Sequence, residues 1–232
     1  RSSGDPVLFV SNPRGMNRSL RGASLDAIRA LNELQFQDTR SPETATRIAQ
    51  YELAFRMQVS VPGVMDISRE SSETLAAYGA EPGASSLANN CLLARRLVEA
   101  GVPCIQVSDI PQGREQHWDL HYANMFDRLK DRLLPRLDQS LSAFLLDLEQ
   151  SGLLDQTLVI VGGEFGRTPW MDKTDGGRQH WPHCYSMLLA GGGIPGGRVF
   201  GSSSRDAAYP LSNAMSPSNW GATLLHLAGF SP

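Results

Sequence analysis

Four of the chain's five histidines lie, with arginines and carboxylates, in three short clusters between His117 and His183. Neutral imidazole nitrogens and carboxylate oxygens are the ligands that zinc and related divalent ions accept. Guanidinium groups bind phosphate and sulfate oxygens through paired N–H donors. The combination predicts one shared polar site for a metal ion and an anion.

The first cluster has the sequence His117-Trp118-Asp119-Leu120-His121. It follows an expected strand and precedes an expected long helix, and ligands of open α/β sheets bind at the carboxyl ends of strands. A carboxylate and an imidazole two positions apart on a loop can turn toward one ion, which makes Asp119 and His121 candidate metal ligands. The alternative is a solvated loop that Trp118 anchors.

The second cluster has the sequence Gly162-Gly163-Glu164-Phe165-Gly166-Arg167-Thr168-Pro169 and follows the apolar run Thr157–Val161 directly. Glu164 is a candidate metal ligand, and Arg167 is a candidate oxyanion-binding group beside it. The alternative is an ion pair between these two residues that only stiffens a turn.

The third cluster has the sequence Gly176-Gly177-Arg178-Gln179-His180-Trp181-Pro182-His183. It ends a loop, from about residue 169, that carries no secondary-structure signal, and long loops of this kind are commonly functional. His180 is a candidate metal ligand and Arg178 a candidate clamp for phosphate or sulfate. For His183, capping of the next strand is the preferred explanation.

The elements that must position these clusters alternate between helical and strand patterns. Helices are expected at about Ser24–Leu34, from Pro42 to Val59, and at Ser71–Tyr78, Ser86–Ala100, Met125–Glu149 and Pro217–Leu227. Strands are expected at Val7–Val10, Val102–Ser108, Thr157–Val161 and Ser186–Ala190. Pro135 should kink or split the long helix. The alternation predicts an α/β fold with a mostly parallel sheet flanked by helices on both faces.

The bulk composition suits one globular domain over residues 1–232, with a helical or irregular part, 1–85, before a metal-site-bearing part, 86–232. The net charge of −3 gives no basic footprint, which excludes nucleic acid as the expected partner. We also expect no membrane span, because no apolar run approaches the roughly 20 residues required. Cys91, Cys104 and Cys184 are too scattered for a disulfide framework. The last two lie in apolar stretches and are expected to be buried.

Taken in order, these motifs are familiar. Trp-Asp-x-His, a long helix, Gly-Glu-Phe-Gly-Arg-Thr-Pro, Gly-Arg-x-His-Trp-Pro and Leu-Leu-Ala-Gly-Gly-Gly together resemble the domain-of-unknown-function family 1501 (DUF1501). That family is sulfatase-like and belongs to the alkaline phosphatase superfamily. The resemblance runs from about Cys91 to the C-terminus and is looser before it.

The resemblance implies an alkaline-phosphatase-like fold with one or two divalent ions, most commonly zinc. Asp119, His121, Glu164 and His180 would be the metal ligands, while Arg167, Arg178 and His117 would contact the substrate. Two positions depart from the pattern. Phe165 stands where the superfamily has a histidine ligand, and Gln179 stands where the family has an aspartate.

The resemblance also implies that this chain corresponds to the C-terminal portion of a family member. The superfamily's nucleophile and first metal-binding aspartate lie upstream of the matched part, so the catalytic nucleophile is unknown and expected outside this chain. Family members often carry export signals, which suggests a periplasmic or secreted protein.

Three functional hypotheses follow. The first is a metal-dependent hydrolase-like domain that acts on a small-molecule or polysaccharide phosphate or sulfate ester. The alternative is a non-catalytic module with a degenerate metal site that binds an anionic ligand, such as a sulfated polysaccharide, through Arg167 and Arg178. A purely structural domain in a larger secreted assembly is a third, weaker option.

Overall fold

The computed structural model describes residues 11–109, 117–121, 125–163, 165–174 and 176–230. The chain divides into two compact units, one of Arg1–Ser71 with Glu81–Ser85 and one of Ser72–Ala80 with Ser86–Pro232. The described residues of all three clusters belong to the second unit, which therefore carries the candidate site. The strand expected at Val7–Val10 lies outside the described residues.

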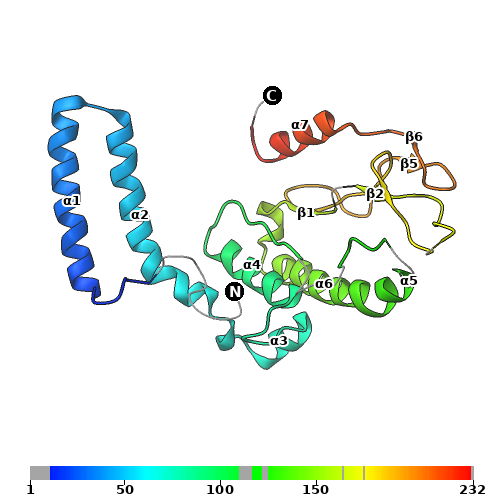
Figure 1. The fold of residues 1–232 in the computed structure, drawn as a ribbon, viewed down its shortest axis with the longest axis horizontal. Coiled ribbons are helices and arrows are strands. Elements are labelled where there is room, and N and C mark those ends of the chain that lie inside the picture. Colours follow the sequence, from blue (N-terminus) through cyan, green and yellow to red (C-terminus); the bar gives the residue numbers. More distant parts are fainter. Residues whose placement is uncertain (1–10, 110–116, 122–124, 164, 175, 231–232) are drawn as a thin grey trace. The chain divides into compact units, whose positions relative to one another are not determined.

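The first unit is built around a hairpin of two helices, α1 (Arg18–Thr39) and α2 (Pro42–Met65), which lie side by side (Figure 1). The side chain of Asn17 accepts the Leu20 N–H and starts α1 earlier than expected. The start of α2 at Pro42 is confirmed. A short 3-10 helix, η1 (Ile67–Arg69), follows.

The predicted end of α2 at Val59 was wrong, because the helix continues through Pro62 to Met65. A proline interrupts one bond of the helical ladder, but it does not oblige the chain to leave the helix.

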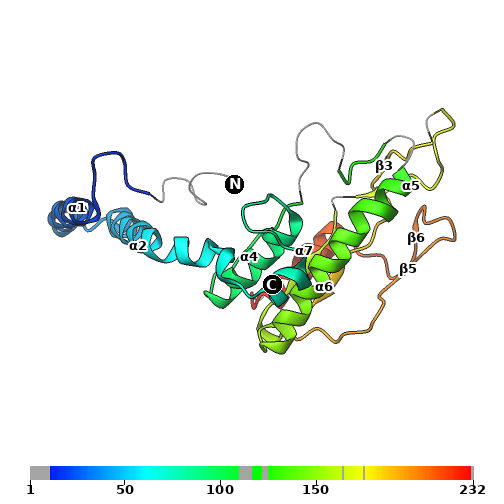
Figure 2. The same ribbon diagram turned by 90° about the horizontal axis from the view of Figure 1, so that it is seen from below.

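The second unit is organised around one long helical segment. The unit begins with two shorter helices, α3 (Ser72–Tyr78) and α4 (Leu87–Glu99). The long segment consists of α5 (Met125–Arg128), the π-helical turn η2 (Leu129–Leu133) and α6 (Leu134–Gln150), which follow one another without a break. Both α3 and α4 pack against α6, as the two ribbon views show (Figures 1 and 2). All of these helices lie where helices were expected, and apolar spacing was the signal for α4 and for the segment from Met125 to Gln150. Gly101 follows α4 with a φ of 77°, a backbone conformation that favours glycine after a helix end.

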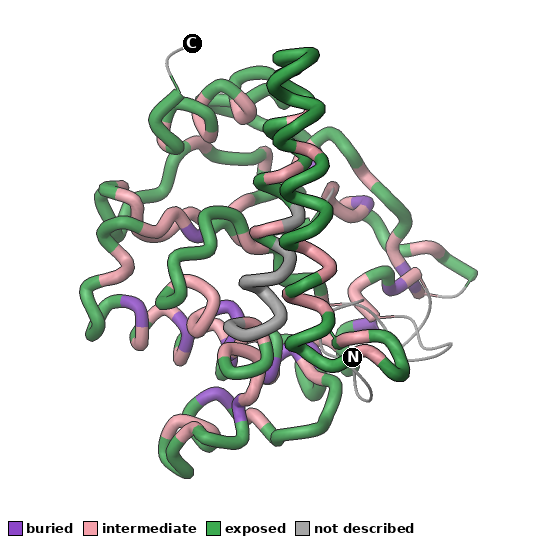
Figure 3. Tube along the Cα trace, turned by 90° about the vertical axis from the view of Figure 1, so that its left-hand side faces the viewer, coloured by how far each residue is buried: buried purple, intermediate pink, exposed green. Residues whose placement is uncertain are grey.

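The apolar core of this unit lies mainly between α4 and α6, and buried stretches are few among the residues that the structure describes (Figure 3). The buried side chains of these two helices are Leu87, Ala88, Asn89, Cys91, Leu92, Ala94, Ser140, Phe144 and Leu148. Leu92 and Leu148 are completely buried. Within each helix the buried residues recur at intervals of mostly three or four positions, as expected for two amphipathic helices that face one another.

A polar network joins three helices beside this core. The Tyr78 hydroxyl donates to Asp147 Oδ2 at 2.9 Å, and Arg95 Nε lies 3.2 Å from the same oxygen. Tyr78 is only 2% exposed. Burial, and then the bond to Asp147, raise the pKa of Tyr78 well above its usual value, so the hydroxyl remains a donor.

The long helical segment continues through Pro135, where a kink or split was expected, and it accommodates the proline with a π turn just ahead of it. Pro135 lacks an N–H and cannot make the usual bond to the preceding turn. The Leu134 N–H donates to Leu129 O instead, five positions back, which gives the wider π turn.

The strands form three two-stranded sheets, all antiparallel in the part of the chain that the structure describes. They are β1 (Val159–Val161) with β4 (Leu188–Ala190), β2 (Gly166–Arg167) with β3 (His180–Trp181), and β5 (Ser202–Ser203) with β6 (Pro210–Ser212). The mixture of helix and strand is confirmed, and so are the strands expected near residues 157–161 and 186–190.

The expected parallel sheet is not found among the described residues. Parallel neighbours need a crossover connection, usually a helix. The described residues between β1 and β4 form β2, β3 and turns, and β4 returns antiparallel to β1. Gly191 then turns with a φ of 71°, where a Cβ would lie against the carbonyl oxygens of Thr157 and Leu154.

Residues 102–108, which were expected to form a strand, contain no regular element. The prediction of buried Cys104 was therefore wrong: Cys104 is exposed, Cys184 is partly buried, and Cys91 on α4 is the buried cysteine. The closing helix α7 (Pro217–Leu227) is confirmed, with the Ser216 side chain accepting the Asn219 N–H. Of the described helices, none combines the length and apolar character needed to cross a membrane.

Replacing Tyr78 by phenylalanine removes the hydroxyl that joins α3 to Asp147. We expect the free energy of unfolding to fall by about 1 kcal/mol, the typical worth of one hydrogen bond. Urea denaturation measures this change. Tyr185→Phe is the matched control: its side chain is exposed, so a change below about 0.5 kcal/mol is expected. Equal effects of the two substitutions would contradict the role of the network.

The cysteines should differ in reactivity. Burial, with the nearby negative charge of Asp109, raises the pKa of Cys91 to about 11, so its thiol stays neutral at pH 8. We expect iodoacetamide at pH 8 to label Cys104 in the folded protein and Cys91 only after unfolding. Peptide mass spectrometry separates the two sites, and comparable labelling of Cys91 in the folded protein would refute the assigned burial.

Candidate functional site

The first cluster is held on the unit by the side chain at its centre. Leu120 is 3% exposed and packs with Met125 and Leu133, against which Trp118 and Leu129 also lie. Since neighbouring side chains of an extended loop point in different directions, burying Leu120 leaves Asp119 and His121 to face away from this core. The loop is anchored by apolar packing and presents polar groups.

The second and third clusters meet as the two strands of one hairpin. Gly166 pairs with Trp181, and Arg167 pairs with His180. A Cβ at Gly166 would lie against the carbonyl oxygen of Cys184, so glycine permits the backbone at residue 166 to approach the backbone at residue 184 closely. Directly opposed residues of antiparallel strands are close neighbours, and Arg167 and His180 therefore act on the same region.

Thr168, directly after β2, is buried and connects the two sides of the loop; it is 6% exposed. Its N–H donates to Gln179 O at 2.9 Å, and its hydroxyl donates to Trp170 O at 2.8 Å. The loop expected to be irregular from residue 169 to 183 thus includes strand β3 and backbone bonds that hold His180 in register.

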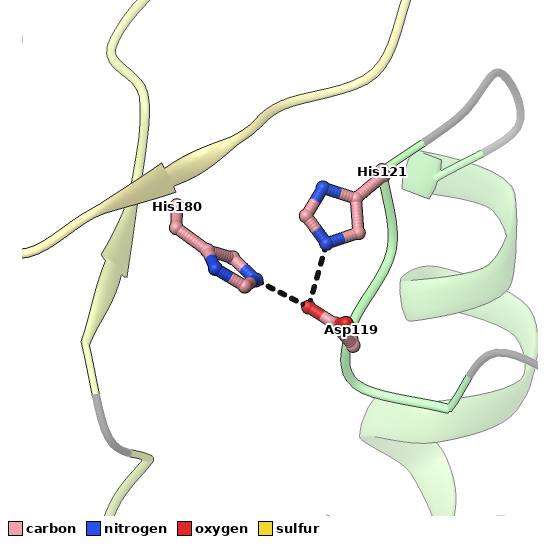
Figure 4. Close-up of side chains that lie close together, drawn as sticks. All are labelled: Asp119, His121 and His180. Atoms are coloured by element: carbon pink, nitrogen blue, oxygen red, sulfur yellow. Dashed lines mark hydrogen bonds and ion pairs between the residues drawn. The ribbon is translucent and has the colours of Figure 1, made fainter.

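A triad of candidate ligands forms where the loop meets the hairpin (Figure 4). Asp119 Oδ1 lies 2.8 Å from His121 Nε2 and 2.7 Å from His180 Nε2. The two rings are tilted, with centroids 4.6 Å apart. The structure therefore brings together three of the four predicted metal ligands.

The orientation of the His121 ring is set by Gln179. His121 Nδ1 lies 2.8 Å from Gln179 Oε1, an acceptor to which the ring can donate. A neutral imidazole that donates from Nδ1 keeps its lone pair on Nε2, the nitrogen that faces Asp119. Gln179 thus favours the tautomer that a metal ligand requires.

Arg167 approaches the same carboxylate from the hairpin. Its Nη2 donates to Asp119 Oδ1 at 2.7 Å and to Trp118 O at 3.1 Å. Its Nη1 lies 3.5 Å from His121 Nε2. The predicted oxyanion-binding arginine is therefore beside the triad.

These contacts favour the charged form of the carboxyl. The bond from His180, followed by that from Arg167, holds the pKa of Asp119 well below its usual range, with His121 adding to the effect. Asp119 is therefore an ionised acceptor at any physiological pH, as a metal ligand must be.

The triad fits a divalent ion. Its ligand atoms all lie within 4.8 Å of one another, and two imidazole nitrogens with one carboxylate oxygen form a common zinc ligand set. The side chains of Asp119 and His180 are 58% and 44% exposed, which leaves room for a further ligand from solution. Such an open position is typical of catalytic rather than structural zinc sites.

His117, predicted as a substrate contact, is engaged elsewhere. Its Nε2 lies 2.9 Å from Asp109 Oδ2, and Arg136 Nη2 lies 3.2 Å from the same nitrogen. The Trp118 indole N–H also donates to Asp109 Oδ2, at 2.8 Å. In the described contacts His117 and Asp109 support the loop behind the triad.

Arg178, predicted as an anion clamp, also has structural partners. Its Nη1 donates to Thr168 O at 2.8 Å and to Pro169 O at 3.3 Å. Its guanidinium carbon lies 5.9 Å from the centre of the Phe126 ring. These contacts hold the loop beyond β2, and they bring Arg178 to loop carbonyls rather than to Asp119.

The last predicted metal ligand, Glu164, lies outside the described residues. Its neighbour Phe165 packs on His180, with ring centroids 4.2 Å apart. Phe165 thereby restricts the orientation of that imidazole and supplies an apolar wall. The phenyl ring offers no ligand atom.

The structure adds two residues that sequence reasoning did not assign to the site. Gln179 was noted only for departing from a family pattern, although its place beside His180 was a usable signal. Asp109 directly follows the segment that was expected to be a strand, and a carboxylate just beyond a strand end is a recognised signal of function. Both act by supporting other side chains, which spacing alone does not reveal.

Comparison with known proteins gives one match. The sequence profile of a family described as protein of unknown function (DUF1501) matches residues 1–232. The match includes all three clusters. No curated protein and no solved structure matches the chain significantly.

Proposed function

Because the chain belongs to the DUF1501 family, whose function is unknown, we propose a function from the chemistry of its site: a metal-dependent, hydrolase-like domain that acts on a phosphate or sulfate ester. The observation that carries the proposal is the convergence of Asp119, His121 and His180, with Arg167 in contact with the same carboxylate. A cation site beside a guanidinium suits an anionic group better than a neutral one.

The proposed ion is zinc, held by the triad. A bound zinc ion would polarise the ester oxygen and stabilise the negative charge that develops there. Asp119 supplies the compensating negative charge, and Gln179 keeps Nε2 of His121 available. We infer one ion here rather than two, because Phe165 occupies the neighbouring position.

Arg167 is the proposed oxyanion-binding residue. Its planar fork of N–H donors matches the oxygens of phosphate and sulfate, and its side chain is 24% exposed beside the triad. We assign these four residues to binding and charge stabilisation, and the nucleophile to another part of the full-length protein. The place of the chain in the alkaline phosphatase superfamily, with a sulfatase-like site, is part of the same proposal.

Metal analysis tests the site. Protein purified without chelators or metal-binding tags should hold about one divalent ion per chain, measured by plasma mass spectrometry. Asp119→Ala and His180→Ala each remove one of three ligands and should abolish tight retention. His226→Ala is the matched control, because His226 lies exposed on α7 away from the triad residues in sequence, and it should retain the ion. Unchanged metal content in both ligand variants would refute the site.

A second candidate function is a binding module for an anionic ligand, such as a sulfated polysaccharide, without turnover. Phe165 favours it, since a second metal ligand is replaced there by an aromatic ring. The commitment of Arg178 to backbone carbonyls weighs against the version in which two arginines clamp the ligand.

Turnover by the full-length, metal-loaded protein separates the two functions. The hydrolase proposal predicts cleavage of 4-nitrophenyl phosphate or 4-nitrophenyl sulfate, with a loss of about 100-fold or more in kcat/KM for Asp119→Ala. The His226→Ala variant should retain full activity. Metal-dependent binding of heparin with no release of 4-nitrophenol from either ester would support the binding module instead.

A further inference from the structure

Arg167 and a divalent cation need the same oxygen atom. Asp119 Oδ1 already has three nitrogen neighbours: His180 Nε2 at 2.7 Å, Arg167 Nη2 at 2.7 Å and His121 Nε2 at 2.8 Å. A carboxylate oxygen offers about two lone pairs. An ion that binds both imidazoles would replace their contacts with this oxygen, but the guanidinium would still lie in its way. Arg167 contacts two of the three ligand atoms, with Nη2 at 2.7 Å from Asp119 Oδ1 and Nη1 at 3.5 Å from His121 Nε2. The ion and the guanidinium therefore compete for the same space.

Charge acts in the same direction. Arginine remains protonated in proteins, so Arg167 cannot become neutral when a second cation arrives. Two positive groups at one carboxylate repel each other, and the guanidinium is bound to this carboxylate through a partly exposed contact. Rotating the guanidinium away from Asp119 therefore costs less free energy than keeping both positive groups at this carboxylate.

The remaining contacts of Arg167 keep it nearby. Nη2 also donates to Trp118 O at 3.1 Å, and strand pairing fixes the Arg167 backbone opposite His180. A released guanidinium would thus stay within reach of the triad. There it would have unsatisfied N–H donors next to a cation, and an oxyanion bridging the two would satisfy both.

We propose that Arg167 exchanges partners, from Asp119 to the oxyanion of the ligand, when a divalent cation binds Asp119, His121 and His180. Cation and anion then bind as a linked pair, each raising the affinity for the other by the same factor. This inference rests on the proposed metal site and deepens it: Arg167 is the element that makes anion binding depend on the metal.

The test uses Co²⁺, whose visible spectrum reports on coordination, with sulfate as the anion. For the wild-type protein, the affinity for Co²⁺ should rise about tenfold in sulfate relative to chloride at equal ionic strength, within the usual range of coupling. The affinity for sulfate, measured by calorimetry, should rise by the same factor when Co²⁺ is present. This reciprocity needs no variant and is unaffected by any folding defect.

Two variants assign the coupling to Arg167. Arg167→Gln removes the competing charge, so Co²⁺ should bind at least as tightly in chloride, and sulfate should no longer improve it. Arg198→Gln removes an equal charge from an exposed position and should keep the coupling. Circular dichroism confirms that each variant is folded.

The outcomes separate the two proposals. If Co²⁺ does not bind the wild type in a way that depends on Asp119, the proposed metal site is refuted and the exchange with it. If Co²⁺ binds but sulfate has no effect, as expected for an ion that uses Asp119 Oδ2 and leaves Arg167 in place, only the exchange is refuted. Coupling that persists in Arg167→Gln refutes the exchange as well.

Discussion

One carboxylate oxygen connects the two parts of the site. Asp119 Oδ1 is contacted from its own loop by His121 and from the β2–β3 hairpin by His180 and Arg167. Each strand of this hairpin has only two residues, and their backbone pairing joins the strands to each other rather than to the loop. Charge-assisted bonds are roughly twice as strong as neutral ones, and His180 and Arg167 both make such bonds to this oxygen.

This convergence depends in turn on apolar anchoring. Leu120 is buried between the two ligand residues of the loop and fixes the direction in which they face. Behind the loop, Asp109 contacts His117 and the Trp118 indole. The polar groups at the surface are thus positioned by packing and by a partly buried carboxylate, which is the usual way in which a ligand set is kept preorganised.

Much of the helical structure and the location of the site could be predicted from the sequence. The spacing of Phe144, Leu148 and their neighbours reports directly on burial, and the concentration of histidines marks the region that contains the triad. The direction of the strands could not be predicted, because Val159–Val161 and Leu188–Ala190 would look the same in a parallel or an antiparallel pair. Only the absence of a helical pattern between them carried that information.

Individual side-chain roles were harder to predict for the same reason. Arg167 and Arg178 both follow glycines and look equivalent in sequence, but one contacts Asp119 and the other contacts loop carbonyls. Cys104 lies in an apolar stretch and is exposed, because that stretch joins no sheet among the described residues. Burial is decided by tertiary partners, which local composition does not specify.

The π-helical turn η2 has a consequence for how changes in chain length would be tolerated. Met125 and Leu133 lie slightly more than two α-helical turns apart, at 3.6 residues per turn, and both pack under Leu120. The wider turn absorbs the excess rotation, so the first part of the helix faces the loop core while α6 faces α4. The π turn thus sets the angle about the helix axis between these two packing faces. Loss of a single residue from η2 would leave Met125 and Leu133 seven positions apart, about two regular α-helical turns. Both packing faces, and with them the ligand loop, would then be kept by an ordinary α-helix.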